Sequence, residues 1–479
     1  MDITLRLDER TDLQKSVFGA NCLLIGRPVW YDHPEFIKRY EEAGTPFFRF
    51  PGGTPANYYN PFKGINDEIP ESGRDYARRN QEILERTNGK GQTPAGFFRF
   101  AKKTEARYSV VVNMSTLSVE ENKKWLTEAK RRGADIAAFE LGNELYFGSY
   151  RWAFQTPEDY LECAKKTTGM LRRIYPKAKI GVLVPSHIYT DESFLSDDVP
   201  AGLRRQEEWM EMLRGEDFFD SVVIHLYNTV GMDGKTKRKN FLPYPEAYKH
   251  ALAHLNHSLD ITCDLLENEF PGKSIWITEY GLGGFSGDLR SYKLRGSHLG
   301  GLFSGLMLMK FFERPSVEVS SWHSFSHFFD YIGGEQGLGE EPHLLYHHFK
   351  FFAEPVNKSD YYAPVNIAGC RKREGTPRHP GQYPEVEGGG FFSRSGGYLV
   401  LINKLDTPYR LDQFEALYKG RQRKVTFVRG LQLRPREDQE LSTALRDQVK
   451  LSEVEFEGAD LNAVEIAPYS ITRLEFEWR

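Results

Sequence analysis

Short apolar runs alternate with longer amphipathic stretches from about residue 17 to residue 355. Because this alternation is typical of parallel α/β proteins, we read each run as a strand. The eight predicted strands are Val17–Ile25, Phe47–Pro51, Tyr108–Met114, Ile136–Leu141, Ile180–Val184, Ser221–Tyr227, Ser274–Thr278 and Val317–Trp322. The predicted helices include Ser118–Arg132, Pro157–Tyr175, Pro245–Glu269, Ser291–Phe312 and, after the last strand, His343–Ala353.

Eight such units predict a closed (β/α)8 TIM barrel. A large open, doubly wound sheet would produce a similar pattern. The barrel is favoured because no early strand leads into a GxGxxG turn, and because polar residues of functional type recur at the ends of many strands.

The pattern changes after Pro355. Loops rich in glycine and proline lead into short apolar runs without helices, which predicts an additional C-terminal antiparallel β-sandwich. We expect the barrel to span residues 11–355 and the sandwich to span residues 356–479, completed by residues 1–10 through the strand Ile3–Leu7. The C-terminal strands expected are Tyr398–Ile402, Lys424–Val428, Val449–Phe456 and Ile471–Glu477.

Composition narrows the function classes. The chain has 479 residues, 40% of them hydrophobic, and a net charge of −4, which gives no overall field to attract nucleic acid or an anionic membrane. The longest apolar stretch, residues 300–312, contains Lys310 and is too short to span a bilayer. The four cysteines are scattered without a CxxC pair, so no disulfide framework or zinc knuckle is predicted.

The N-terminus has the alternation of a half-exposed strand and lacks the apolar core of a signal peptide. A secreted chain from which a leader had been removed would begin in the same way. The compartment is therefore left open, as is the oligomeric state.

Two glutamates follow two of the predicted strands. Glu144 comes after Ile136–Leu141, and Glu279 comes directly after Ser274–Thr278. A carboxylate at the end of a barrel strand is held by the strand and open to a ligand. Two such groups can cleave a glycosidic bond, one protonating the leaving oxygen and the other attacking the sugar or activating water.

Each motif also has a structural interpretation. Gly142-Asn143-Glu144 fits a glycine turn followed by a helix N-cap and a first-turn glutamate. Glu279 fits a solvated charge at the rim of a sheet. The catalytic interpretation is favoured because the two motifs follow strands four and seven of the same predicted barrel.

This arrangement resembles the retaining (β/α)8 glycoside hydrolases of the four-seven superfamily, clan A. Phe48-Arg49-Phe50-Pro51-Gly52-Gly53-Thr54 is similar to the second-strand motif of its α-L-arabinofuranosidase and β-glucuronidase–heparanase branches. Pro468-Tyr469-Ser470-Ile471-Thr472 is similar to the C-terminal tails of those branches, which also carry a sandwich completed by N-terminal residues. The resemblance implies that Glu144 is the acid/base and Glu279 the nucleophile.

Four further residues complete the predicted site. Asn143 would bond the sugar hydroxyl beside the reacting carbon, and Arg49 would bind the nucleophile carboxylate and keep its pKa low. His225 and Tyr227 share one face of their strand, so Tyr227 would bond Glu279 while His225 would contact the sugar or the acid/base. A structural ion pair for Arg49 and a buried, satisfied His225 are the alternatives.

Two weaker candidates are Trp322 and Asn113. Trp322 ends the eighth strand, where its indole would form a floor for a sugar ring, although a core aromatic explains it nearly as well. Asn113 ends the third strand, where asparagine often serves only to end a strand.

A metal site is not predicted, and no cofactor is implied. His323 and His327 have the four-residue spacing of a helical metal pair, but no HExxH motif frames them and His323 follows a strand end.

The sequence thus predicts a retaining glycoside hydrolase that acts on a plant, algal or host-glycan poly- or oligosaccharide, with carboxyl groups about 5–5.5 Å apart. A noncatalytic carbohydrate-binding barrel and a metal-dependent barrel hydrolase are the alternatives. The sugar, the linkage, and exo or endo action are left open.

Overall fold

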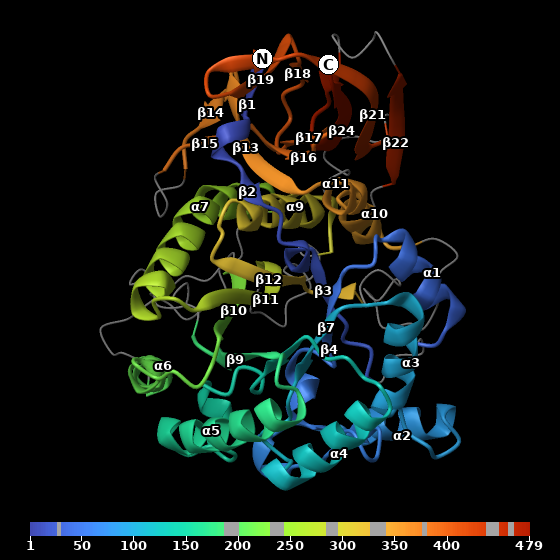
Figure 1. Ribbon diagram of the computed structural model, residues 1–479, viewed down its shortest axis with the longest axis vertical. Helices are drawn as coiled ribbons and strands as arrows, with labels where there is room; N and C mark the ends of the chain where they lie inside the picture. Colours follow the sequence, from blue (N-terminus) through green and yellow to red (C-terminus); the bar gives the residue numbers. More distant parts are fainter. Residues whose placement is uncertain are drawn as a thin grey trace.

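A closed parallel barrel forms the centre of the computed structural model (Figure 1). The structure describes residues 1–25, 30–185, 201–229, 244–283, 296–325, 342–375, 381–436, 450–457 and 464–479. In chain order the barrel strands are β3 (Gly19–Asn21), β4 (Phe47–Phe50), β7 (Tyr108–Val111), β8 (Ala138–Glu140), β9 (Lys179–Leu183), β10 (Ser221–Thr229), β11 (Ser274–Gly283) and β12 (Val317–Trp322). Pairing of Trp322 with Ala20 closes the barrel. Each of these strands overlaps one of the eight predicted, so the predicted barrel is confirmed.

Helices surround the barrel (Figure 1). They are α1 (Pro34–Glu42), α2 (Ala77–Arg86), α3 (Pro94–Thr104), α4 (Val119–Arg131), α5 (Pro157–Ile174), α6 (Ala201–Leu213), α7 (Tyr244–Glu269), α9 (His298–Phe312), α10 (Leu344–Phe351) and α11 (Ala353–Lys358). Local chemistry sets several of the starts: Ser118 and Thr156 form capping boxes before α4 and α5. Ser297 caps α9, so this helix begins later than predicted.

The second part of the molecule is a mainly antiparallel sheet, as predicted. Its strands run in the order β20-β19-β1-β13-β16-β17-β24-β21-β22. Their bounds are β1 (Asp2–Arg6), β13 (Tyr361–Ala368), β16 (Val386–Phe392), β17 (Gly396–Asn403), β19 (Gln413–Tyr418), β20 (Arg421–Arg423), β21 (Val425–Pro435), β22 (Leu451–Glu457) and β24 (Ser470–Trp478). The N-terminal strand β1 lies inside this sheet, between β13 and β19.

The sheet folds back on itself. The first half of β13 pairs with β16 and its second half with β1. The rings of Phe414 in β19 and Phe476 in β24 lie 5.6 Å apart although four strands separate them in the sheet order. Two layers therefore face each other across a small core, as in a sandwich.

The other face of the sheet packs on the barrel. Along β17, Leu399 and Leu401 belong to the core of the sandwich, whereas Val400 and Ile402 belong to the large core that continues into the barrel. In Figure 1, α9, α10 and α11 lie between the barrel and the sheet. The division between residues 355 and 356 remains a prediction, because α11 spans it.

An ion cluster lies in this contact. Lys404, after β17, is 2.6 Å from one oxygen of Glu387 in β16, and Lys310 of α9 is 3.4 Å from the other oxygen. Burial alone would raise the pKa of Glu387, but the charges of the two lysines outweigh it and lower the pKa to about 2. Lys404 is almost fully buried, and Glu387 is its ion-pair partner among the described residues.

We expect Glu387→Gln to lower the free energy of unfolding by about 3 kcal/mol at pH 7, because it leaves the Lys404 ammonium buried without a counter-charge. The folded pKa of Glu387 is depressed, so its contribution is present above an unfolded value of about 4.3 and is lost as the pH falls toward 2. The difference between variant and wild type should shrink over that interval. Urea unfolding at several pH values measures this difference in the free energy of unfolding. Glu455→Gln, at an exposed position in β22, is the control, and equal stabilities of the two variants would contradict the prediction.

Candidate active site

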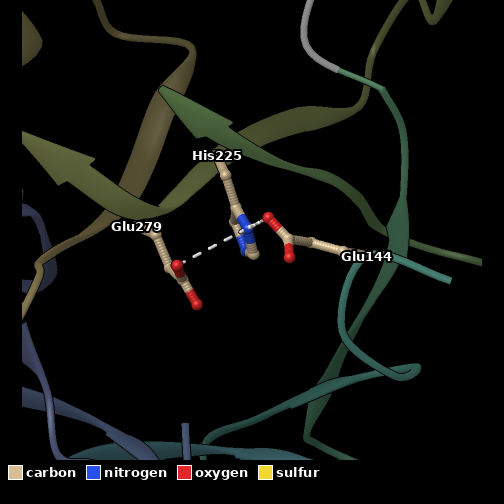
Figure 2. Close-up of side chains that lie close together, drawn as sticks. All are labelled: Glu144, His225 and Glu279. Atoms are coloured by element: carbon tan, nitrogen blue, oxygen red, sulfur yellow. Dashed lines mark hydrogen bonds and ion pairs between the residues drawn. The ribbon is translucent and has the colours of Figure 1, made fainter. Parts of the chain in front are cut away.

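The barrel brings the two predicted glutamates together. Glu144 lies in the turn after β8, Glu279 in β11, and His225 in the neighbouring β10. One carboxylate oxygen of each glutamate and one ring nitrogen of His225 lie within 4.8 Å of one another. Figure 2 shows the three side chains converging, with His225 between the two carboxylates. Residues far apart in the sequence thus form a single cluster.

A bulge in β11 aims Glu279 into this cluster. Ile224 pairs with Ile277, but the next residue, His225, pairs with Glu279, so Thr278 is an extra residue on its strand. Strict alternation would point Thr278 and Glu279 to opposite faces. Instead Thr278 donates to a buried carboxylate of the barrel interior, that of Glu140 (3.2 Å), while Glu279 reaches the guanidinium of Arg49.

Arg49 binds groups at the ends of two other strands, β8 and β11. Its side chain is fully buried at the end of β4. Nε donates to Glu140 (2.8 Å), Nη1 to Glu279 (2.7 Å) and Nη2 to the amide oxygen of Asn143 (2.9 Å). Nη2 also lies 3.4 Å from Nε2 of His225. The predicted contact between Arg49 and Glu279 is therefore present in the structure, together with three contacts that were not predicted.

Glu279 is surrounded by donors and cations. Tyr227 donates its hydroxyl to Oε2 at 2.5 Å, and His323 Nδ1 is 3.5 Å from the same oxygen. Burial alone would raise the pKa of Glu279, but the charges of His225, His323 and Arg49 and the bond from Tyr227 outweigh it and hold the pKa well below its ordinary value. Glu279 is therefore ionised across the neutral range.

His225 lies between the two carboxylates. Its Nδ1 lies 2.8 Å from Glu144 and 3.8 Å from Glu279. Burial by itself lowers the pKa of His225, but the charge of Glu279, followed by the bond to and the charge of Glu144, outweighs it and raises the pKa above 6.5. His225 and Tyr227 both reach Glu279, as expected of residues that share one face of a strand.

A tight turn presents Glu144. Gly142 and Glu144 both have positive φ, at 92° and 51°, and the left-handed conformation is unusual for a glutamate. Asn57 holds the turn by accepting from the N–H of Asn143 (2.9 Å) and donating to its carbonyl oxygen (2.6 Å). No α-helix of the described chain begins here, because α5 starts at Pro157, so the N-cap interpretation of Asn143 is wrong.

Two predicted residues, Trp322 and Asn113, have structural contacts of their own. Trp322 is buried between the barrel and α10, with its ring 5.5 Å from that of Phe349, which favours its interpretation as a core aromatic. Asn113 donates to the carbonyl oxygen of Tyr59 (3.1 Å) and accepts from the backbone N–H groups of Ser115 and Thr116. Asn113 thus shapes the turn after β7.

Sequence reasoning missed four residues that touch the cluster: Glu140, Asn21, Asn57 and His323. A glutamate inside the apolar run Ile136–Leu141 was a usable signal for Glu140, because a buried carboxylate requires a buried partner. For His323, the sequence suggested only the role of a metal ligand. Asn21 donates to Glu279 (3.3 Å), and no sequence signal marked it or Asn57.

Glu144, His225 and Glu279 have the spacing of three metal ligands. A metal ion would have to displace existing partners, because Arg49 donates to one oxygen of Glu279 and Tyr227 to the other. The pair His323 and His327 gives no further support: His323 faces Glu279, and His327 lies outside the described residues.

Solved structures share this fold. Over 99% of both chains, the structure is similar to the thermostable GH51 α-L-arabinofuranosidase from Thermotoga petrophila (14% identity, TM-score 0.68) and to a family 51 α-L-arabinofuranosidase from Bifidobacterium longum (15%, 0.66). It is also similar, again over 99% of both chains, to a Paenibacillus polymyxa xyloglucanase of glycoside hydrolase family 44 (11%, 0.60). The chain has the two-part barrel fold of these glycoside hydrolases.

Sequence comparison adds nothing to this result, since the chain matches no protein-family model and no curated protein. At sequence identities of 11–15%, the structural similarity establishes a shared fold and no more. Among the described residues, no helix combines the length and the apolarity needed to cross a bilayer.

We expect Glu279→Gln to lower the pKa of His225, because it removes the negative charge that raises this pKa most. An NMR titration of ¹³C-labelled imidazoles measures the value, with the His225 signal assigned by its absence in His225→Gln. Glu455→Gln should leave the signal unmoved. An identical His225 titration in wild type and Glu279→Gln would show that the two side chains are not coupled.

Proposed function

We propose that the protein is a retaining glycoside hydrolase. The observation that carries this proposal is the approach of Glu144 and Glu279, whose nearest carboxylate oxygens lie within 4.8 Å. Retaining enzymes place their two carboxyl groups about 5–5.5 Å apart, whereas inverting enzymes need about 6.5–9.5 Å to admit a water molecule. The glycoside hydrolases that share the fold support the same reaction class.

The surroundings of the two carboxylates support different roles. Glu279 is largely buried, ionised and oriented by Arg49 and Tyr227, as a nucleophile must be. Glu144 is more exposed, with 18% of its side chain accessible against 7% for Glu279, and it pairs with His225. This position suits a group that exchanges protons with substrate and water.

The reaction then has two steps. Glu279 attacks the anomeric carbon and forms a glycosyl ester while Glu144 gives its proton to the departing oxygen. In the second step Glu144 takes a proton from water, the water oxygen attacks the anomeric carbon, and Glu279 leaves as a carboxylate. Two inversions restore the original configuration.

Asn143 is suited to hold the sugar. Its amide oxygen accepts from Arg49, which fixes the orientation of the amide, and its Nδ2 is buried with no acceptor among the described residues. A buried donor without a partner is costly. The hydroxyl beside the reacting carbon would satisfy it, in a bond able to strengthen in the transition state.

The substrate class is a poly- or oligosaccharide of plant, algal or host-glycan origin. A noncatalytic carbohydrate-binding barrel is disfavoured, because separated and outward-facing carboxylates would suit that role and these two converge. Loss of turnover on addition of a chelator would favour the third candidate, a metal-dependent hydrolase.

Glu279→Gln tests the nucleophile. We expect kcat on aryl glycosides to fall at least about a thousandfold, because an amide cannot form the ester. A panel of arabinofuranosides, xylosides, glucuronides and galactosides identifies the substrate, and NMR of the first product anomer should show retained configuration. Glu455→Gln should keep full activity, whereas more than a few per cent of activity in Glu279→Gln would remove Glu279 from this role.

Glu144→Ala tests the acid/base. Substrates with poor leaving groups should lose far more kcat/KM than activated aryl glycosides, because a good leaving group needs little protonation. Azide should accelerate the second step and give a glycosyl azide of retained configuration, since this anion attacks without a general base. Equal losses on both substrate types, without azide rescue, would instead assign Glu144 a structural role.

A further inference from the structure

A cavity lies beside the glutamate cluster. Its volume is about 350 Å³, within the range of sites for small molecules. Residues after β3 and β4 form one side, among them Leu23 and Gly52, and the segment that leads into α2 forms the other with Arg74, Asp75, Tyr76 and Arg79.

This cavity and the glutamate cluster share a wall. A Cβ on Gly52 would lie 1.7 Å from Oδ1 of Asn21, so the backbone at Gly52 is in direct contact with this side chain. Asn21 in turn donates to Glu279 at 3.3 Å. Gly52 and Asn21 thus connect the lining of the cavity to the nucleophile, so the cavity adjoins the glutamate cluster.

Two arginines line the cavity without a carboxylate partner. Neither Arg74 nor Arg79 has an acidic group of the described chain within ion-pair distance, whereas Arg78, on the same helix, pairs with Glu82 (3.0 Å). Asp75 is the one acidic residue among those lining the cavity, and its Oδ1 accepts the backbone N–H of Ala77 (2.9 Å). Two cations thus face one carboxylate that is already engaged.

The remaining features of the cavity also favour an anion. The N-terminus of α2 begins beside it, and the partial positive charge of that helix end adds to the two guanidinium groups. The guanidinium of Arg79 lies 6.0 Å from the ring centre of buried Tyr76. A guanidinium fork binds carboxylate and sulfate oxygens through paired hydrogen bonds.

We propose that this cavity is an anion subsite and that the substrate is an acidic glycan. Arg74 and Arg79 bind a carboxylate or sulfate on the sugar unit next to the one that Glu279 attacks. This inference rests on the proposed function, since it assigns the charge of that enzyme's substrate. A carboxylate and a sulfate both present oxygens that a guanidinium can bind through paired hydrogen bonds. The experiment distinguishes carboxylated from sulfated substrates.

The experiment compares each acidic glycan with its own neutral counterpart. Uronic-acid oligosaccharides are paired with carboxyl-reduced forms and sulfated galactan oligosaccharides with desulfated forms, and kcat/KM is measured for each. We expect wild type to favour one acidic form at least tenfold, and the preference to weaken as salt rises. In the double variant Arg74→Gln/Arg79→Gln this preference should disappear, whereas Arg78→Gln, which alters an exposed arginine outside the cavity, should retain it.

Binding to Glu279→Gln gives a readout that does not depend on turnover. Calorimetric titration with the same oligosaccharides should show tighter binding of the acidic form, lost when Arg74→Gln and Arg79→Gln are added. A wild type that cleaves or binds neutral counterparts as well as acidic ones overturns the subsite, as does a preference that survives in the double variant. Absence of turnover on every glycan and aryl glycoside would instead refute the glycosidase, while the binding comparison would still decide on the subsite.

Discussion

The structure of the site depends on one buried cation. The guanidinium of Arg49 is fully removed from solvent and binds Glu140, Glu279 and Asn143, which belong to β8, β11 and the turn after β8. A buried charge is tolerated only where partners compensate it, so the positions of these groups are mutually determined. The same ion cluster that secures the interior of the barrel therefore orients the proposed nucleophile.

Around this cation the two glutamates occupy different environments. Glu279 lies beside Arg49, Tyr227 and the two histidines, which hold its pKa low in spite of burial. Glu144 lies on a turn with left-handed backbone, toward solvent, and meets the rest of the cluster through His225. Backbone strain of this kind persists only where the surrounding structure enforces it, here through the bonds between Asn57 and Asn143. The asymmetry of the pair supports separate roles in one reaction.

The sheet domain stabilises the barrel by a different means. It covers α9, α10 and α11 with a continuous apolar face, and the cluster of Lys310, Glu387 and Lys404 lies in the contact. Strand β1 precedes the barrel in the sequence and pairs inside this sheet. The N-terminal segment is therefore bound to the C-terminal part of the molecule. Both ends of the chain lie in the sheet (Figure 1). The barrel is thus held at its two chain ends by one structure.

Hydrophobic periodicity by itself determined the order of strands and helices, the change of architecture near residue 355 and the strand ends at which Glu144 and Glu279 lie, because the spacing of apolar residues is a local property of the sequence. Arg49, singled out by the sequence resemblance, and His225 and Tyr227, singled out by strand alternation, all lie beside Glu279. Tertiary structure alone decided that Asn21, Asn57 and His323 lie around the two glutamates and their turn, that Trp322 packs on Phe349, and that Asn113 bonds the backbone at Tyr59. The reason is physical: the extra residue at Thr278 and the left-handed turn at Glu144 alter which way side chains point. The first depends on pairing between β10 and β11, and the second on hydrogen bonds from Asn57, so both depend on segments distant in sequence.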